Sequence, residues 1–150
     1  MKKFTILSAI LIMSNLLSAQ WVQQNLNYPV EGALTDIFFI NHNHGWAVGE
    51  SDEYGYQYHY TNDGGNEWHS FMVFSLPKAN SIFFSDENNG WIVFDGGNIL
   101  HSTDGGGNLF SWELQESGTG YDLMDVFFID SLNGWVAGDS SFYPQVGVSC

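Results

Sequence analysis

The sequence predicts an all-β fold made of repeated four-stranded units. Three observations lead to this prediction. First, three eleven-residue segments align without gaps and each ends in a Gly-Trp pair; they are residues 36–46, 81–91 and 125–135, and their tryptophans are 45 and 44 residues apart. Second, an element rich in Asp and Gly recurs, and the tryptophans that follow it, Trp68 and Trp112, are 44 residues apart. Third, no helical hydrophobic period appears after residue 20. A fixed period of this size is typical of repeat architectures.

Each repeat divides into four strands in order. The first strand is β-branched and aromatic, at 34–40, 80–85 and 124–129, and a polar turn follows it. The second begins at the Gly-Trp pair, at 45–49 and 90–94. The third covers 56–61 and 98–102, and the fourth covers 68–74 and 112–115 after the Asp-Gly-Gly turn. Four short antiparallel strands in 44–47 residues make up one β-propeller blade.

The repeats predict the domain organisation. We expect residues 20–150 to form a partial propeller of about 2.5–3 blades, with repeats at about 34–74, 80–116 and 124–150. Trp21 lies 47 residues before Trp68, so residues 21–30 are expected to be the last strand of a preceding or closing blade. Complete propellers have about 4–8 blades. The sequence therefore predicts an incomplete ring and the N-terminal piece of a longer protein.

The N-terminal residues predict a signal peptide over 1–19. Lys2 and Lys3 form a basic start, an apolar run of 14 residues follows from Phe4 to Leu17, and Ser18-Ala19 offers small residues for cleavage. The run is too short to cross a bilayer as a helix, and we expect no membrane span elsewhere. The predicted location is outside the cytoplasm after Sec-dependent export: secreted, periplasmic or on the cell surface.

The charge of the chain excludes several classes of partner. Its formal charge is −14, it has no Arg, and from Gln20 onward Lys78 is the single basic side chain against 17 acids, a charge of −16. Nucleic acids and anionic membrane surfaces bind basic footprints, so neither is expected as a partner. The one cysteine, Cys150, excludes an intramolecular disulfide framework and a cysteine-based zinc site.

The turn element resembles the Asp-box, also called the bacterial neuraminidase repeat, with the pattern Ser/Thr-x-Asp-x-Gly-x-x-Trp. The matching residues are Thr61, Asp63, Gly65 and Trp68 in one copy, and Ser102, Asp104, Gly106 and, after a three-residue insertion, Trp112 in the other. An Asp carboxylate accepts backbone N–H groups across such a bend, and Gly supplies a positive φ. The resemblance implies a structural role between the third and fourth strands of a blade, remote from any active site.

A longer match is more specific. Residues 89–106 run Gly-Trp, apolar strand, Gly-Gly, Ile-Leu and Asp-box, and resemble the repeat of the photosystem II assembly and stability factor family of propellers. The resemblance covers about residues 21–149. The repeated Gly-Trp pairs are Gly45, Trp46, Gly90, Trp91, Gly134 and Trp135. Photosynthetic members are expected to use an Arg-containing surface, which this chain lacks, so the resemblance implies the fold and not the photosystem role.

Two groups of side chains are candidates for a ligand site. Tyr54, Tyr56, Tyr58 and Tyr60 alternate along one strand face and could stack on sugars, although packing between blades is the interpretation we favour. His42 and His44 share a turn but have no evident third ligand, and the Asp-Gly-Gly turns lack the distal Glu of an EF-hand loop. We therefore expect no metal, no cofactor and no catalytic residue.

The sequence thus predicts an exported, non-catalytic propeller module that serves as a scaffold for an unknown protein or glycan. Further blades in cis or self-association would cover its open faces. One alternative is a fragment of a glycoside hydrolase, but not of a sialidase, because sialidases clamp the substrate carboxylate with Arg. Two acids about 5–9.5 Å apart in a shared cleft would favour this enzyme. The other alternative is a structural cell-surface protein.

Overall fold

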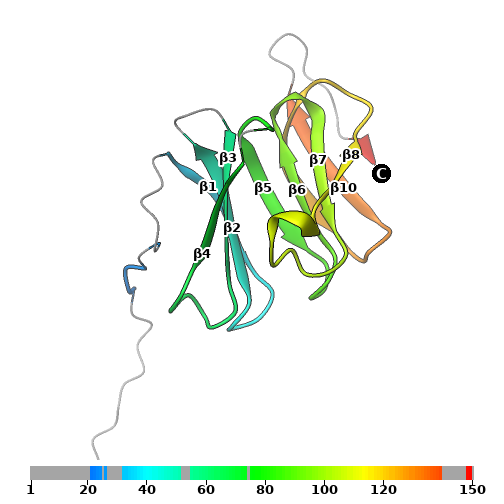
Figure 1. The fold of residues 1–150 in the computed structure, drawn as a ribbon. Helices are drawn as coiled ribbons and strands as arrows, with labels where there is room; N and C mark the ends of the chain where they lie inside the picture. Colours follow the sequence, from blue (N-terminus) through cyan, green and yellow to red (C-terminus); the bar gives the residue numbers. More distant parts are fainter. Residues whose placement is uncertain are drawn as a thin grey trace, which may run out of the picture.

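The computed structural model describes residues 21–24, 26, 32–51, 55–73, 75–139 and 148–149, and the predicted signal peptide lies outside them. These residues form three antiparallel sheets (Figure 1). The first blade contains β1 (Leu34–Phe39), β2 (Gly45–Ser51), β3 (Gly55–Thr61) and β4 (His69–Val73). The second contains β5 (Ala79–Phe84), β6 (Gly90–Phe94), β7 (Asn98–Ser102) and β8 (Glu113–Glu116). The third contains β9 (Asp122–Phe128), β10 (Gly134–Asp139) and β11 (Val148–Ser149).

The strands follow one another within each sheet. The order is β1-β2-β3-β4 in the first blade, β5-β6-β7-β8 in the second and β11-β10-β9 in the third. Two single-turn 3-10 helices, Asp95–Gly97 and Leu109–Ser111, interrupt the second blade. The all-β class and the four-stranded antiparallel blades predicted from the repeat are confirmed, and the strand bounds differ from the prediction by a residue or two.

The glycine of each Gly-Trp pair is required by the sheet register. Gly45, Gly90 and Gly134 lie opposite the last phenylalanine of the preceding strand. A Cβ added at Gly90 would lie 2.4 Å from the ring of Phe84, and the other two positions are as tight. The phenylalanine ring therefore lies across the glycine, which explains why this residue recurs where the second strand begins.

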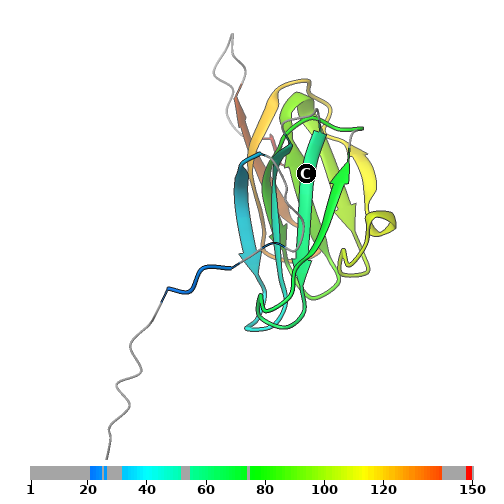
Figure 2. The same ribbon diagram turned by 60° about the vertical axis from the view of Figure 1, so that its left-hand side comes forward.

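The blades pack face to face (Figure 2). Two apolar clusters of side chains hold them together. The larger cluster lies between the first and second blades and includes Trp46, Tyr58 and Phe84. The smaller cluster lies between the second and third blades and includes Trp91 and Phe128. Among the first strands, β5 contacts both β1 and β9. They are therefore the inner strands of the partial ring.

The strand expected over 21–30 is not formed at residues 21–24 and 26, the part of this range that the structure describes. None of the described strands pairs with this segment, and Trp21 is fully exposed. A strand needs a hydrogen-bonding neighbour, so a strand-like sequence alone does not produce one. Within the described parts of the chain, no helix is long and apolar enough to cross a membrane.

Candidate binding surface

The first Asp-box is a hydrogen-bonded turn between β3 and β4. The Thr61 hydroxyl accepts the N–H of Gly65 at 2.9 Å and donates to the Asp63 carboxylate at 2.9 Å. Asp63 also accepts the N–H of Glu67 at 3.0 Å, and these bonds lower the pKa of its carboxyl group. Gly65 has a φ of +88°, and Trp68 behind it is buried. The turn is held by its own residues, as the resemblance implies.

The second Asp-box repeats this turn and accommodates the insertion. The Ser102 hydroxyl accepts the N–H of Gly106 at 2.9 Å and donates to Asp104 at 3.0 Å. The inserted residues form the 3-10 helix Leu109–Ser111, which places Phe110 in solvent with 98% of its side chain exposed. Trp112 still reaches the core between the first two blades. The insertion therefore loops outward without displacing the tryptophan from its packing position.

The tryptophans of the Gly-Trp pairs join neighbouring blades. Trp46 stacks on Phe84 of the second blade at 3.7 Å between ring centroids and donates its indole N–H to the carbonyl of Gly105 at 3.1 Å. Trp91 stacks on Phe128 of the third blade at 3.5 Å. Trp135, the next in the series, is 49% exposed. Trp46 and Trp91 thus each belong to a contact made with the following blade.

The tyrosine stripe is not a ligand surface at the positions that the structure describes. Tyr56 and Tyr58 are 3% and 1% exposed and lie in the cluster between the first two blades. Burial raises the pKa of Tyr56 to about 12 and that of Tyr58 well above its usual value. Tyr60 is half-buried beside His69, and Tyr54 lies outside the described residues. The alternation placed the tyrosines on the face that the second blade covers.

The polar turn expected between the first two strands of each blade has a repeated hydrogen-bond pattern that the sequence analysis did not predict. The side chain of Asn41, Asp86 or Asp130 accepts the backbone N–H groups two and three residues later at 2.8–2.9 Å. These bonds lower the pKa of Asp86 and of Asp130. The signal was present as a polar residue, Asn or Asp, at the same place in all three aligned segments.

Two carboxylates come together on the inner strands. The Ser81 hydroxyl lies 2.8 Å from an Asp36 oxygen and 3.3 Å from an Asp125 oxygen, so these oxygens are no more than about 6 Å apart. This upper limit leaves room for the separation of about 5–5.5 Å that retaining glycoside hydrolases use. However, the same Asp36 oxygen also accepts the N–H of Ile82 at 2.9 Å, and neither acid lines the cleft or the cavity described next. The pair joins β1, β5 and β9.

An open cleft of about 240 Å³ lies between the first two blades, at the end that carries the Asp-boxes; we call it the inter-blade cleft. Its walls come from the turns that end the strands, and Trp46 and Tyr60 contribute aromatic surface. Glu87 and Asp104 add carboxylates, and Asn41 donates to Glu87 at 3.3 Å. The remaining lining residues are His44, Thr61, Asn62, Asn88, Gly105 and Gly107. Acidic groups beside aromatic rings suit a cationic side chain.

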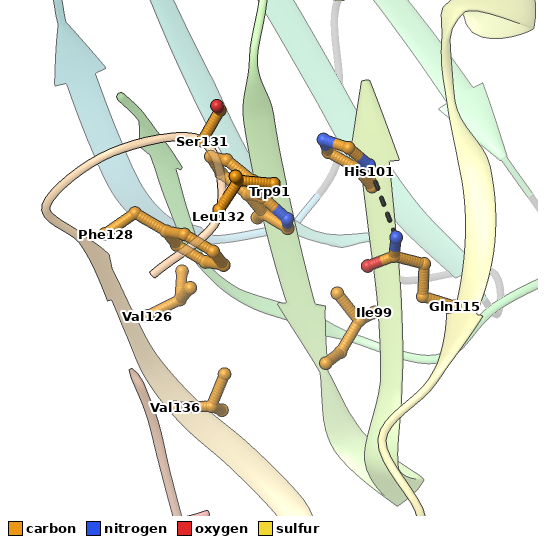
Figure 3. Close-up of a pocket in the computed structure, with 9 residues that line it drawn as sticks. All are labelled: Trp91, Ile99, His101, Gln115, Val126, Phe128, Ser131, Leu132 and Val136. Carbon is orange, nitrogen blue, oxygen red and sulfur yellow. Dashed lines mark hydrogen bonds between the residues drawn. The ribbon is translucent and has the colours of Figure 1, made fainter. Parts of the chain in front are cut away.

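A cavity of about 260 Å³ lies between the second and third blades, and Figure 3 shows the nine residues that line it. Its wall is mainly apolar, with Trp91 and Phe128 stacked on one side and Ile99 facing them. His101 and Gln115, joined by a 3.3 Å hydrogen bond, form the polar part. The Nε2 atom of His101 is buried and has no hydrogen-bond partner among the described residues.

The structure groups no three metal-ligating side chains among its described residues. His42 is exposed in the β1–β2 turn, whereas His44 is half-buried and lines the inter-blade cleft. The Asp-Gly-Gly turns use their carboxylates to accept hydrogen bonds from their own residues. The described residues thus offer polar and aromatic surface for binding, and they include no group of side chains arranged to hold a metal ion.

Repeated antiparallel sheets packed face to face, with an Asp-box between the third and fourth strands of two of them, define the chain as an Asp-box β-propeller protein. Residues 13–117, well over half of the chain, match the family model described as Photosynthesis system II assembly factor YCF48. The chain belongs to this family. Comparison with curated proteins gives no significant match.

Two solved structures share the fold. The structure of YCF48 bound to D1 peptide has 26% identity and a TM-score of 0.58, over 73% of this chain and 36% of that one. YCF48 from Cyanidioschyzon merolae has 20% identity and a TM-score of 0.56, over 74% of this chain and 36% of that one. The chain therefore spans a little over a third of the length of these proteins.

Proposed function

We propose that the chain is an exported, non-catalytic propeller module that binds a basic segment of a partner protein. The observation that carries this proposal is the inter-blade cleft, where Glu87 and Asp104 lie beside Trp46 and Tyr60. The strong negative charge of the chain attracts basic partners over a longer range. One of the related structures is YCF48 bound to D1 peptide, which supports a protein partner over a glycan.

The binding site is tested with two short fluorescent peptides of equal length, one carrying Lys and the other carrying Glu at the same positions. Fluorescence anisotropy should detect binding of the Lys peptide only, and the affinity should fall with added salt because the contact is electrostatic. Glu87→Gln should weaken binding about threefold to tenfold, a loss typical of one charge partner. Glu113→Gln, an exposed acid outside the cleft, is the matched control. Equal losses in both variants would contradict the cleft as the site.

Export is a separate part of the proposal, and its support is the basic, apolar and small-residue pattern of residues 1–19. The full chain expressed in a Gram-negative host should appear outside the cytoplasm in a form shortened by about 2 kDa, as expected for loss of a leader of this length. Leu11→Arg places a charge in the apolar run and should retain the full-length form in the cytoplasm. Retention of the unaltered chain would refute export.

Glycoside hydrolysis is the alternative that the Asp36 and Asp125 pair favours. Both carboxylates accept backbone N–H groups, Asp36 from Ile82 of the next blade and Asp125 from Val126, which supports a structural role. We therefore expect no turnover of a panel of p-nitrophenyl glycosides. Turnover that disappears in both Asp36→Asn and Asp125→Asn, with folding retained by circular dichroism, would establish the enzyme instead.

A further inference from the structure

The insertion in the second Asp-box is a feature that the repeat does not explain. Five residues separate Gly106 from Trp112, whereas two residues separate Gly65 from Trp68 in the first box. Both boxes nevertheless form the same hydrogen-bonded turn, and the tryptophan of each box packs against the fold. The turn therefore forms without the three extra residues, and their role lies outside the packing of the blades.

The inserted residues form a local structure that holds Phe110 in solvent. The Asn108 side chain accepts the N–H of Phe110 at 2.9 Å and donates to the Ser111 hydroxyl at 2.9 Å. Ser111 is buried, whereas Phe110 is 98% exposed and Leu109 beside it is 38% exposed. Figure 2 shows this loop, in yellow, projecting from the second blade. Single exposed apolar residues are common on protein surfaces, so the position of this one decides what it can do.

The insertion borders the inter-blade cleft. Gly107, three residues before Phe110, lines this cleft together with Asp104 and Gly105 of the same turn. Three residues of chain extend about 10–11 Å at most, so the Cα atom of Phe110 lies within this distance of the cleft wall. Both blades that flank the cleft have all four strands. One short peptide can therefore contact the cleft and Phe110 together.

The acidic groups of the cleft leave a need for such a second contact. Glu87 and Asp104 are both exposed. An ion pair made at an exposed carboxylate contributes little to affinity, because water and salt screen it. Burying apolar surface adds affinity that salt does not screen, and interfaces commonly combine an apolar anchor with polar contacts around it. A basic segment that also covers Phe110 would bind more tightly than a basic side chain alone.

We propose that the partner segment carries a large aliphatic or aromatic side chain two to four residues from the basic residue that enters the inter-blade cleft, and that this side chain packs on Phe110. The inference rests on the proposed function of the cleft and gives that function a sequence preference. An extended peptide advances about 3.3 Å per residue, so two to four residues span about 7–13 Å. This span matches the reach of the chain from Gly107 to Phe110.

The experiment is fluorescence anisotropy of the full chain with peptides of one lysine in a Gly-Ser background. In one series, a leucine lies two, three or four residues before or after the lysine; the reference peptide has serine instead. At least one leucine peptide should bind about tenfold more tightly than the reference, the gain expected for burying part of an apolar side chain. The ratio of the two affinities should hold as salt is added, although both affinities fall.

The Phe110→Ala variant assigns this gain to one side chain. It should bind the leucine peptide and the reference peptide equally, with the affinity that the unaltered chain has for the reference. Ile129→Ala, which removes an exposed apolar side chain of the third blade, is the matched control and should keep the gain. Because both side chains are exposed, both variants should fold, and thermal melts verify this.

The outcomes separate this inference from the proposed function on which it rests. Binding of the lysine peptides that is weakened by Glu87→Gln but equal for leucine and serine would overturn the inference and leave the cleft as the site. A leucine gain that survives in Phe110→Ala, or that is lost equally in Ile129→Ala, would overturn it as well. Failure of every lysine peptide to bind would refute the proposed function and the inference together.

Discussion

At the scale of single residues, His59 is a polar side chain that the described fold buries completely. Its side chain is 0% exposed, and its ring nitrogens lie 2.8 Å from the Ser70 hydroxyl and 2.8 Å from the Gln57 amide oxygen. Burial lowers the pKa of His59 to about 4. The folded chain therefore holds a neutral imidazole over a pH range in which the unfolded chain binds a proton.

This pKa predicts acid lability in a defined window. The contribution of His59 is complete above its unfolded pKa of 6.5 and is lost as the pH falls toward 4, where about 3 kcal/mol at most is gone. His101, whose pKa is also lowered by burial, adds to the same slope. Urea unfolding at about pH 4.5 and pH 7, on either side of the unfolded pKa, measures the effect. His59→Gln should reduce the difference between the two, and an unchanged difference would contradict this account.

The glycine of the Gly-Trp pair gives a second prediction at this scale. Gly90→Ala places a methyl group 2.4 Å from the Phe84 ring and should destabilise the fold by about 1–3 kcal/mol, the usual cost of overpacking. Gly107→Ala is the matched control, because its Cβ would meet nothing within 4 Å. Denaturant midpoints of the two variants compare them directly. A Gly107→Ala variant that loses as much stability as Gly90→Ala would refute the packing argument.

At the scale of elements, the two Asp-box turns differ in how fully the carboxylate is used. Asp63 accepts from both Thr61 and the N–H of Glu67, whereas Asp104 accepts from Ser102. Asp63→Ala should therefore lower the melting temperature more than Asp104→Ala at pH 7. The difference should fade below pH 3.8, because the lowered pKa of Asp63 stabilises the fold while its carboxyl group is ionised. Melting curves at about pH 7 and pH 3 provide the test.

Sequence reasoning placed these elements well because each is encoded locally. The strand bounds follow from short apolar runs between Asx and Gly turns, and the Asp-box holds itself together with bonds over two to four residues. It placed the tyrosines on one face of β3 and favoured packing between blades over a sugar-stacking surface. Burial of Tyr58 depends on the second blade, which is 20 or more residues away in sequence. The segment after Trp21 was also predicted from local sequence alone, and whether it forms a strand depends on a pairing partner elsewhere in the fold.

At the scale of the whole molecule, the three blades are not equally supported. The second blade packs on both sides, against the first through the larger cluster and against the third through the smaller one. The third blade has one covered face and exposes Met124, Phe127 and Trp135. Stability therefore decreases from the second blade to the third.

Hydrogen exchange should follow this order. The amide groups of β6 and β7 should be protected most, and those of β9 and β10 should exchange at least tenfold faster, because fewer buried contacts oppose their local opening. Mass spectrometry of peptides from the two regions measures the rates. Equal protection in β6 and β9 would show that the third blade opens only with the rest of the molecule.

The sequence by itself determined the class of this protein, because a fixed period, Gly-Trp pairs and Asp-boxes each specify local geometry that repeats. It also determined the charge and the partners that the charge disfavours. The tertiary structure decided which faces are available. It buried Tyr56 and Tyr58, joined Asp36 and Asp125 through Ser81, and left Trp135, Phe39 and the cavity beside Phe128 unfilled. These outcomes depend on which blade lies beside which, and this information lies in the contacts between repeats.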